Sequence, residues 1–273
     1  VFNMLKIIPL FILGPVKTKQ NANGLIITGS LMPEFILTDR KLALQECLKG
    51  LQFASKIRDD SMIFGLGALW PMMTNRGMLL KKYQKNNLLI TNGHCGTLIS
   101  LFLMIKKMAA LSDKPLSELS ISILGVGKMG TNLARILYGK VAAIALIDIN
   151  ENALNKAEEK LKHTMAQTDI QKYTNAMETG NIKNILTNTH ITVCTTSNLK
   201  RILKPNQIPD NTIIIDDSRP EAISRALCHN RGVVVIEGGL MKIKGLEQYY
   251  DFGFGIDENV FGRLAEVFLM AAD

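Results

Sequence analysis

The sequence has little of what would place it outside the ordinary globular proteins. Its four cysteines, Cys47, Cys95, Cys194 and Cys228, lie far apart and form neither a CxxC pair nor a cysteine–histidine cluster. This spacing excludes a zinc ribbon and a disulfide scaffold and indicates reduced thiols. Aromatic residues make up 6% of the chain, with one tryptophan, which disfavours a base-stacking platform. Neither an internal repeat nor a block of like charges is visible.

No hydrophobic run long enough to cross a bilayer stands out near the start of the chain. The run from Met4 to Gly14 is interrupted by Lys6 and Pro9, and it is shorter than the ~20 residues that a span requires. It also lacks the small-residue exit site of a cleaved signal. We interpret Ile7–Leu13 as a buried strand, and we expect a cytoplasmic protein without an integral membrane span.

What the sequence does have is a positive charge and enough length for a core. Its 273 residues contain 32 Lys and Arg against 24 Asp and Glu, a formal net charge of +8, and 47% are apolar. That length allows one large domain or two modest ones. The charge suits an acidic ligand or partner such as a nucleotide or an acyl carrier. Because the basic residues are scattered and no recognition motif is present, nucleic-acid binding is not expected.

The first part of the chain mixes helical and strand patterns. A helix is predicted to start at Thr38-Asp39 and to end near Ile57. Further predicted elements are short strands at Met62–Leu66 and Leu88–Ile90, a loop at Trp70–Gly77, a tight turn at Thr91–Gly96 and a fully buried apolar helix at Thr97–Ala110. The segment Ser112–Glu118 is the best linker candidate.

After this linker, apolar strands alternate with helices. Predicted strands are Ser120–Leu124, Ala142–Ile147, Ile191–Cys194, Thr212–Ile215 and Val233–Ile236, and predicted helices follow Gly130, span Asn152–Met165 and span Asn259–Ala272. Such alternation is typical of a parallel sheet covered on both faces. The expected fold class is therefore α/β, with a doubly wound Rossmann sheet and a smaller N-terminal α/β domain. The expected division is 1–112 for substrate and catalysis and 113–256 for the dinucleotide.

A glycine motif, Gly125-Val126-Gly127-Lys128-Met129-Gly130, joins the first of these strands to its helix. In a dinucleotide site, the first glycine permits the tight turn, the second lets the backbone approach the pyrophosphate, and the third lets helix and strand pack closely. The helix N-terminus then offers free N–H groups to the phosphates. The motif alone is weak evidence, and the alternative is a plain glycine-rich turn.

Asp148 strengthens the dinucleotide interpretation. It ends the next strand, 18 residues after Gly130, where a carboxylate can accept both ribose hydroxyls of NAD and would repel the 2′-phosphate of NADP. Lys128 lies close to the expected phosphate position and could partly offset that repulsion. The predicted cofactor is NAD, with NADP as the less favoured alternative.

Other polar strand ends should meet the same edge of the sheet, because ligands bind beyond the carboxyl ends of parallel strands. Thr195, Thr196 and Ser197 follow one strand and Asp217 another, and we assign all four to the cofactor site. Gly238 follows a third strand and could let the backbone approach the nicotinamide. A polar loop cap for the first group, and a simple turn for Gly238, are the alternatives.

His94 and Cys95 lie in the predicted turn before the apolar helix. A helix N-terminus lowers the pKa of a thiol, and a histidine can serve as an acid or base. We therefore take His94 and Cys95 as catalytic candidates. The alternatives are a turn histidine with a satisfied hydrogen bond and a small buried cysteine. No metal site is predicted.

Taken together, several segments resemble the cyanobacterial long-chain acyl-carrier-protein reductases and their relatives of shikimate-dehydrogenase type. They are Leu31–Glu34, Gly65–Ala68, Ile90–Thr97, Ile123–Gly130, Ile214–Pro220, Glu237–Gly239 and Phe261–Met270. The resemblance implies a small α/β domain joined to a Rossmann domain, with a last helix, residues 257–273, that returns to the first domain. It also implies reduction of an acyl thioester to an aldehyde through a nicotinamide cofactor and a cysteine acyl-enzyme.

Two departures from that family point to a different substrate. Arg263 stands where the family cysteine would be, and Asp148 stands where an NADPH-dependent reductase has a basic residue. The sequence therefore predicts a nicotinamide-dependent oxidoreductase that transfers hydride to or from a carbonyl, alcohol or amine, with His94 as the proton donor. The alternatives are a reductase of acyl-carrier-protein or CoA thioesters that uses Cys95, and a non-catalytic NAD-binding protein. A homodimer stays open, because no interface can be recognised.

Overall fold

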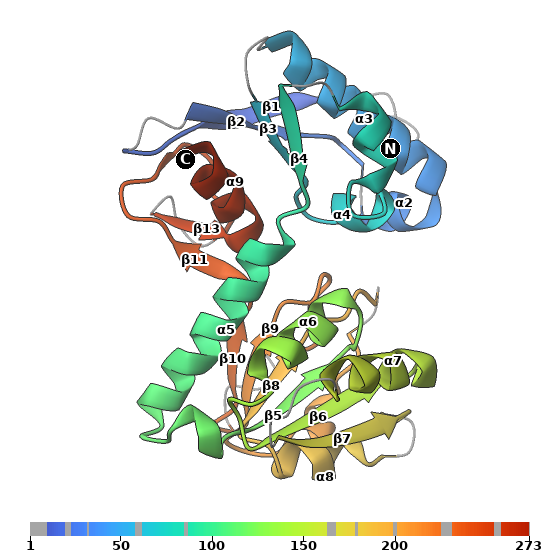
Figure 1. The fold of residues 1–273 in the computed structure, drawn as a ribbon, viewed down its shortest axis with the longest axis vertical. Coiled ribbons are helices and arrows are strands. Elements are labelled where there is room, and N and C mark those ends of the chain that lie inside the picture. Colours follow the sequence, from blue (N-terminus) through green and yellow to red (C-terminus); the bar gives the residue numbers. More distant parts are fainter. Residues whose placement is uncertain are drawn as a thin grey trace. The chain divides into compact units, whose positions relative to one another are not determined.

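The structure is a computed structural model that describes residues 10–19, 23–31, 33–57, 62–84, 87–162, 168–177, 180–198, 201–224, 231–253 and 258–272. The chain divides into two compact units, residues 1–97 with 240–273 (unit 1) and residues 98–239 (unit 2). The units therefore change over at Thr97/Leu98 and Gly239/Leu240, whereas the sequence predicted boundaries at 112/113 and 256/257. Figure 1 labels the elements of both units.

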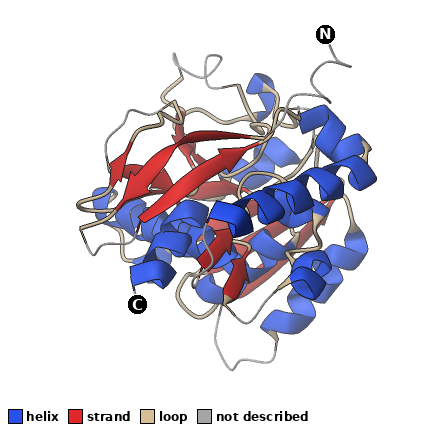
Figure 2. Ribbon diagram, turned by 90° about the horizontal axis from the view of Figure 1, so that it is seen from above, coloured by secondary structure: helices blue, strands red, loops and turns tan. Residues whose placement is uncertain are grey.

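Unit 2 is built on a parallel sheet of six strands. They are β5 (Ser120–Leu124), β6 (Ala143–Asp148), β7 (Asp169–Thr174), β8 (Ile191–Cys194), β9 (Ile213–Asp216) and β10 (Val234–Glu237). Their spatial order is β10-β9-β8-β5-β6-β7, so the chain starts in the middle, runs to one edge and then returns to run to the other. This is the strand order of the doubly wound Rossmann fold, and it confirms the predicted fold class (Figures 1 and 2).

After β5, unit 2 forms two helices that the sequence predicts, although with later predicted starts, and one short helix that it does not predict. They are α6 (Lys128–Leu137), α7 (Glu151–Leu161) and α8 (Ile182–Thr187). At the start of α7, the side chain of Asn150 accepts a hydrogen bond from the N–H of Ala153 at 3.2 Å, which satisfies one of the unpaired donors of a helix N-terminus. The observed helix therefore starts at Glu151, one residue before the predicted start at Asn152, and residues 163–165 of the predicted helix Asn152–Met165 lie outside the described part.

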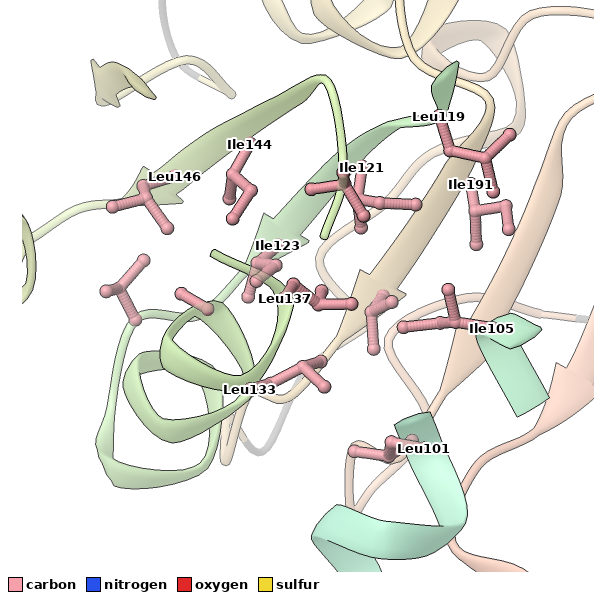
Figure 3. Packing of buried hydrophobic residues seen from close by; sticks show 14 of the residues in the cluster. Leu101, Ile105, Leu119, Ile121, Ile123, Leu133, Leu137, Ile144, Leu146 and Ile191 are labelled. Atoms are coloured by element: carbon pink, nitrogen blue, oxygen red, sulfur yellow. The ribbon is translucent and has the colours of Figure 1, made fainter. Parts of the chain in front are cut away.

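The core of unit 2 lies on both faces of this sheet. On one face Ile121, Ile123, Ile144 and Leu146 pack against Leu133 and Leu137 of α6 and against Leu101 and Ile105 (Figure 3). On the other face the cluster includes Leu124, Ile147, Cys194, Ile214 and two residues of α8, Ile182 and Ile185. Because the strands bury both faces, they show continuous apolar runs rather than alternation.

The long helix α5 (His94–Leu111) differs from its prediction in two ways. It starts at His94, not at Thr97, and it is not buried all round. Leu101, Ile105 and Ala109 are buried, whereas Ile99 and Leu103 are about half exposed. By length and composition alone, with a mean hydropathy of 1.3 over 18 residues, α5 is apolar enough to cross a membrane. Core helices pass the same test, and three of its side chains are core residues.

Unit 1 combines small sheets with helices. One sheet has the order β12-β1-β2, a second pairs β3 with β4 in parallel, and a third pairs β11 with β13 antiparallel. The strands are β1 (Phe11–Lys17), β2 (Asn23–Thr28), β3 (Met62–Gly65), β4 (Leu88–Thr91), β11 (Leu240–Lys242), β12 (Glu247–Gln248) and β13 (Asn259–Phe261). Its helices are α2 (Pro33–Thr38), α3 (Arg40–Ile57), α4 (Trp70–Met73) and α9 (Gly262–Ala272), besides the start of α5.

Several predicted boundaries in unit 1 are wrong for identifiable reasons. The first strand runs over Phe11–Lys17 rather than Ile7–Leu13, because its partners in β2 and β12 lie opposite these later residues; residues 7–9 lie outside the described part. The predicted loop Trp70–Gly77 begins with the helical turn α4, which has Pro71 in its first turn. The predicted last helix begins with β13, because Asn259–Phe261 pairs with β11.

Candidate functional site

The glycine turn between β5 and α6 has the backbone that the motif predicts. Gly125 has φ of +95°, a conformation that strongly favours glycine. A Cβ there would lie 2.7 Å from Cγ2 of Thr196. The N–H of Gly125 donates to the carbonyl of Ile147 at 2.9 Å. The turn therefore leaves β5 beside the end of β6.

The other two glycines have opposite surroundings. A Cβ on Gly127 would meet no atom within 4 Å, whereas a Cβ on Gly130 would overlap the carbonyl oxygen of Gly125 and lie 2.9 Å from Oγ1 of Thr195. Gly130 is thus required for packing. Gly127 has open space where a pyrophosphate would approach the N-terminus of α6. The residues present fit a dinucleotide at this turn.

Asp148 lies at the end of β6, next to the glycine turn. Its Oδ2 accepts a hydrogen bond from the N–H of Val126 at 2.6 Å, and its Oδ1 accepts one from the N–H of Asn150 at 2.9 Å. These two bonds fix the carboxylate against the turn. Because an ionised carboxylate can accept about four hydrogen bonds, two backbone donors leave capacity for ribose hydroxyls.

The polar end of β8 also lies against the glycine turn. Thr195 donates from Oγ1 to the carbonyl of Gly125 at 2.7 Å. The N–H of Thr196 donates to Oγ of Ser218 at 3.2 Å, which links the end of β8 to the loop after β9. Ser197 is exposed in the loop that follows. The structure therefore brings Thr195 and Thr196 to the turn, as the shared sheet edge predicts.

The loop after β9 is organised by Asp216, a residue that the sequence analysis did not select. Its buried carboxylate accepts hydrogen bonds from the N–H groups of Ser218 at 3.0 Å and Ala222 at 2.8 Å. The N–H of Asp217 donates to the carbonyl of Cys194. Gly238, after β10, lies so close to Asp217 that a Cβ would come within 2.8 Å of its Cα. The packing with Asp217 explains this glycine without a ligand.

Lys128 and Met129 occupy the first turn of α6. Lys128 is exposed and stands at the helix N-terminus, where its positive charge would add to the attraction of the helix end for an anionic phosphate. Met129 is partly buried and packs against the core of unit 2. The structure therefore places Met129 as a packing residue on its helix.

A second cluster lies in unit 1, around the start of α5. His94 is the first residue of α5, and its N–H donates to Oδ1 of Asn92 at 3.0 Å. This side-chain bond satisfies a backbone N–H at the start of the helix, which begins at His94. The observed turn is therefore shorter than the predicted turn Thr91–Gly96. Cys95, the next residue, is exposed.

Burial and two guanidinium groups control the protonation of His94. Burial, and then the positive charges of Arg263 and Arg76, lower the pKa of His94 to about 4, while the carboxylate of Glu266 acts in the opposite direction. His94 is therefore neutral at pH 7. Among the described residues, no three His, Cys, Asp or Glu side chains gather closely enough to hold a metal ion.

Glu266 is the residue of this cluster that the motif search missed. It lies on α9, 170 residues from Gly96 in the sequence. The N–H of Gly96 donates to Oε2 of Glu266 at 2.7 Å, and the hydroxyl of Thr91 donates to Oε1 of Glu266. No local pattern links positions so far apart. The available signal was the family-like segment Arg263-Leu264-Ala265-Glu266, in which the resemblance singles out only Arg263.

A comparison with protein families matches the predicted cofactor domain. Residues 120–199 match the family described as "3-hydroxyacyl-CoA dehydrogenase, NAD binding domain". This match, together with the strand order and the glycine turn, confirms the expected NAD-binding Rossmann domain. A search of curated proteins yields no match to this chain.

Solved structures similar to this chain include one synthase and two dehydrogenases. A dipicolinate synthase structure from Bacillus halodurans is 13% identical with a TM-score of 0.45, over 64% of this chain and 56% of that chain. Shikimate 5-dehydrogenase from Listeria monocytogenes, in complex with shikimate and NAD, is 12% identical with a TM-score of 0.39, over 56% and 55%. Quinate dehydrogenase from Corynebacterium glutamicum, in complex with NAD, is 10% identical with a TM-score of 0.40, over 57% and 54%. The chain spans little more than half the length of each, so their activities do not transfer to it.

Proposed function

We propose that this protein is an NAD(H)-dependent oxidoreductase that acts on a small carbonyl, alcohol or amine. The observation that carries the proposal is the glycine turn of unit 2. Gly127 faces open space, the N-terminus of α6 follows at once, and Asp148 is fixed beside the turn by two backbone N–H groups. These are the parts that hold a pyrophosphate and a ribose in a dinucleotide site.

The chain's residues have separable roles in this proposal. Backbone N–H groups at Gly127 and Lys128 bind the pyrophosphate, and Asp148 accepts bonds from the ribose hydroxyls. Thr195 and Thr196 support the turn through the bonds described above. When bound, the nicotinamide supplies the hydride donor or acceptor. NAD is favoured over NADP because the charge of Asp148 opposes a 2′-phosphate at this position.

His94 is the proposed proton carrier for the substrate. Because its imidazole is neutral at pH 7, it accepts a proton from an alcohol or ammonium group during oxidation. In the reductive direction, His94 first takes up a proton from solvent, and the imidazolium gives it to the oxygen or nitrogen of the group that receives the hydride. The sequence analysis considered His94 as an acid or base and favoured it as the proton donor; the neutral imidazole favours the role of acceptor at pH 7. The proposal thus covers the substrate class, a carbonyl, alcohol or amine, and both directions of hydride transfer.

Binding of NADH to Asp148→Ala tests the cofactor assignment. Without the carboxylate, NADH should bind on the order of tenfold more weakly, equivalent to about 1.4 kcal/mol, and NADPH should bind as well as or better than in the wild type. Fluorescence titration with both cofactors measures the two affinities. Asp169→Ala, an exposed carboxylate on β7, is the matched control. An unchanged NADH affinity in Asp148→Ala would contradict the assignment.

A second candidate function, thioester reduction, is favoured by the exposed position of Cys95 in the first turn of α5. We propose that the Cys95 thiolate attacks the thioester carbonyl and displaces the carrier thiol, leaving an acyl-enzyme. Hydride transfer to the acyl carbon then releases an aldehyde and regenerates the thiolate. The partner would be an acyl carrier protein or CoA thioester.

Intact mass after incubation with acyl thioesters separates the two functions. An adduct that disappears on addition of NADH, and is absent from Cys95→Ser, supports thioester reduction. If no thioester forms an adduct, direct hydride transfer to or from a free carbonyl, alcohol or amine is favoured. Binding of NADH without turnover of any substrate class would favour a non-catalytic NAD-binding protein.

A further inference from the structure

Glu266 ties together three segments of unit 1 that are distant in sequence. Its carboxylate accepts bonds from the Thr91 hydroxyl at the end of β4 and from the N–H of Gly96 in the first turn of α5. Glu266 itself lies in α9, which packs on β3 so tightly that a Cβ on Gly65 would overlap Val267. Both carboxylate oxygens thus bind parts of the chain that flank His94.

The two helices meet at a pair of glycines. A Cβ on Gly96 would overlap the carbonyl oxygen of Gly262, and a Cβ on Gly262 would lie 2.6 Å from the carbonyl carbon of Gly96. The N-terminal ends of α5 and α9 therefore approach each other closely. Each end carries a partial positive charge, so their approach is unfavourable unless a negative group lies between them.

The charge balance of the cluster gives Glu266 a second effect. Arg263, in the first turn of α9, lies against Gly93: a Cβ added to Gly93 would lie 2.5 Å from the Cβ of Arg263. Arg76 joins the cluster through its backbone, because its carbonyl accepts a bond from the Asn92 side chain at 3.3 Å. The positive charges of Arg263 and Arg76 thus act on His94, which itself lies at a helix N-terminus, and Glu266 is the carboxylate among the charged groups that act on it.

We propose that Glu266 is the positioning residue of the His94 site, where it holds the first turn of α5 against α9 and keeps the imidazole able to take up a proton. It does not contact the substrate; it acts through the turn that carries His94 and through its charge. Without that charge, the imidazolium formed during proton transfer would face positive charges alone. The catalytic meaning of this role rests on the oxidoreductase function proposed above, but the role itself concerns the free protein.

Titration of His94 by NMR, in the absence of cofactor and substrate, tests this role. The chain contains four histidines, and the ring signal that disappears in His94→Asn identifies His94. The substitution Glu266→Gln is the informative one, because an amide can still accept from Gly96 and bond to Thr91 but carries no charge. We expect it to lower the pKa of His94 by on the order of half a pH unit. Glu247→Gln, an exposed residue of β12, should leave the titration unchanged.

A second background keeps the titration within the range where the protein is folded. Because Arg76 lowers the pKa of His94, Arg76→Gln should raise it, and Arg76→Gln/Glu266→Gln should then lie below Arg76→Gln alone. In Glu266→Ala, the amide of Gly96 should also lose its protection from hydrogen exchange, and Glu266→Gln should restore it. These opposite shifts and the rescue by glutamine would not arise from a purely structural role.

Two results would overturn the proposal. One is a His94 titration that is the same in Glu266→Gln and in the wild type, in both backgrounds. The other is a Gly96 amide that exchanges equally slowly in Glu266→Ala and in the wild type. Neither measurement involves NAD. A failure of the oxidoreductase proposal would be seen separately, as the absence of NADH binding to the wild-type protein.

Discussion

At the scale of single residues, the three glycines of the turn share one motif, but each position favours glycine for a different physical reason. Gly125 is required by its positive φ, Gly130 by contact with the Gly125 carbonyl, and Gly127 by neither. The open space at Gly127 is where the proposed pyrophosphate would lie. This contrast makes the motif testable one position at a time.

Alanine at Gly127 and at Gly130 should have different effects. Gly130→Ala forces a methyl group into backbone, and we expect the free energy of unfolding to fall by about 1–3 kcal/mol. Gly127→Ala should leave stability within about 0.5 kcal/mol, since its φ of −70° suits any residue, but it should weaken NADH binding because the methyl group occupies the pyrophosphate space. Denaturant unfolding and NADH titration measure the two effects. Equal loss of stability in both variants would contradict this division.

The cysteines differ in reactivity for a reason visible at the same scale. Burial raises the pKa of Cys47 to about 12 and raises that of Cys194 well above its ordinary value, whereas Cys95 is exposed. Since the thiolate is the reactive form, iodoacetamide at pH 8 should modify Cys95 and leave Cys47 and Cys194 unmodified. Peptide mass spectrometry of the native protein, in a Cys228→Ser background, measures each site. Labelling of Cys194 before unfolding would show that β8 is less tightly packed than described.

At the scale of elements, the structure explains why α9 belongs with the N-terminal segment. Val260, Ala265 and Phe268 form a buried cluster with Val16 of β1 and Leu246. The contacts with Val16 join residues more than 200 positions apart. The same helix brings Glu266 to the first turn of α5, so the packing of α9 and the His94 cluster depend on each other.

The contact between α5 and α9 should therefore be sensitive to one added methyl group. Gly262→Ala would place a Cβ 2.7 Å from the N–H nitrogen of Thr97, and we expect a loss of about 1–3 kcal/mol in unfolding free energy. Leu269→Ala, on the exposed face of the same helix, should change stability by less than about 0.5 kcal/mol. Thermal unfolding of both variants provides the comparison. A Gly262→Ala variant as stable as the wild type would mean that α5 and α9 can move apart without a loss of unfolding free energy.

At the scale of the whole molecule, the partly buried His94 links stability to pH. His94 has an ordinary pKa of 6.5 when unfolded and about 4 when folded, so between these values the unfolded chain binds more protons. The free energy of unfolding should therefore fall as the pH is lowered from about 6.5 to 4, by on the order of 1–3 kcal/mol for this group, because solvent screens part of the effect on a partly exposed ring. It should be unaffected by His94 above pH 7.

Comparison with His94→Gln isolates this contribution. His190, whose pKa is also lowered by burial, changes the unfolding free energy in the same direction. Carboxylates with lowered pKa values, such as Glu158, reduce the unfolding free energy when they are protonated at more acidic pH. All of these are shared by the variant. The difference between wild type and His94→Gln in urea unfolding should thus shrink as the pH falls through this window. A constant difference would show that His94 titrates normally in the folded protein.

The sequence by itself determined the features that depend on neighbours in the chain. The apolar runs and glycine punctuation identify five of the six strands of unit 2, because buried parallel strands need continuous apolar residues. It missed β7, an edge strand with mostly exposed polar side chains. The glycine motif and Asp148 are also local, since they lie on consecutive strands.

Only the tertiary structure decided what depends on contacts between distant segments. The positions of Glu266 and Arg263 beside His94, the meeting of Gly96 with Gly262, and the neutral state of His94 all require α9 to pack against the start of α5. Burial and the sum of neighbouring charges set a pKa, and neither quantity is a property of a local pattern. The partial exposure of α5 has the same origin, because an apolar composition does not state which face a helix buries.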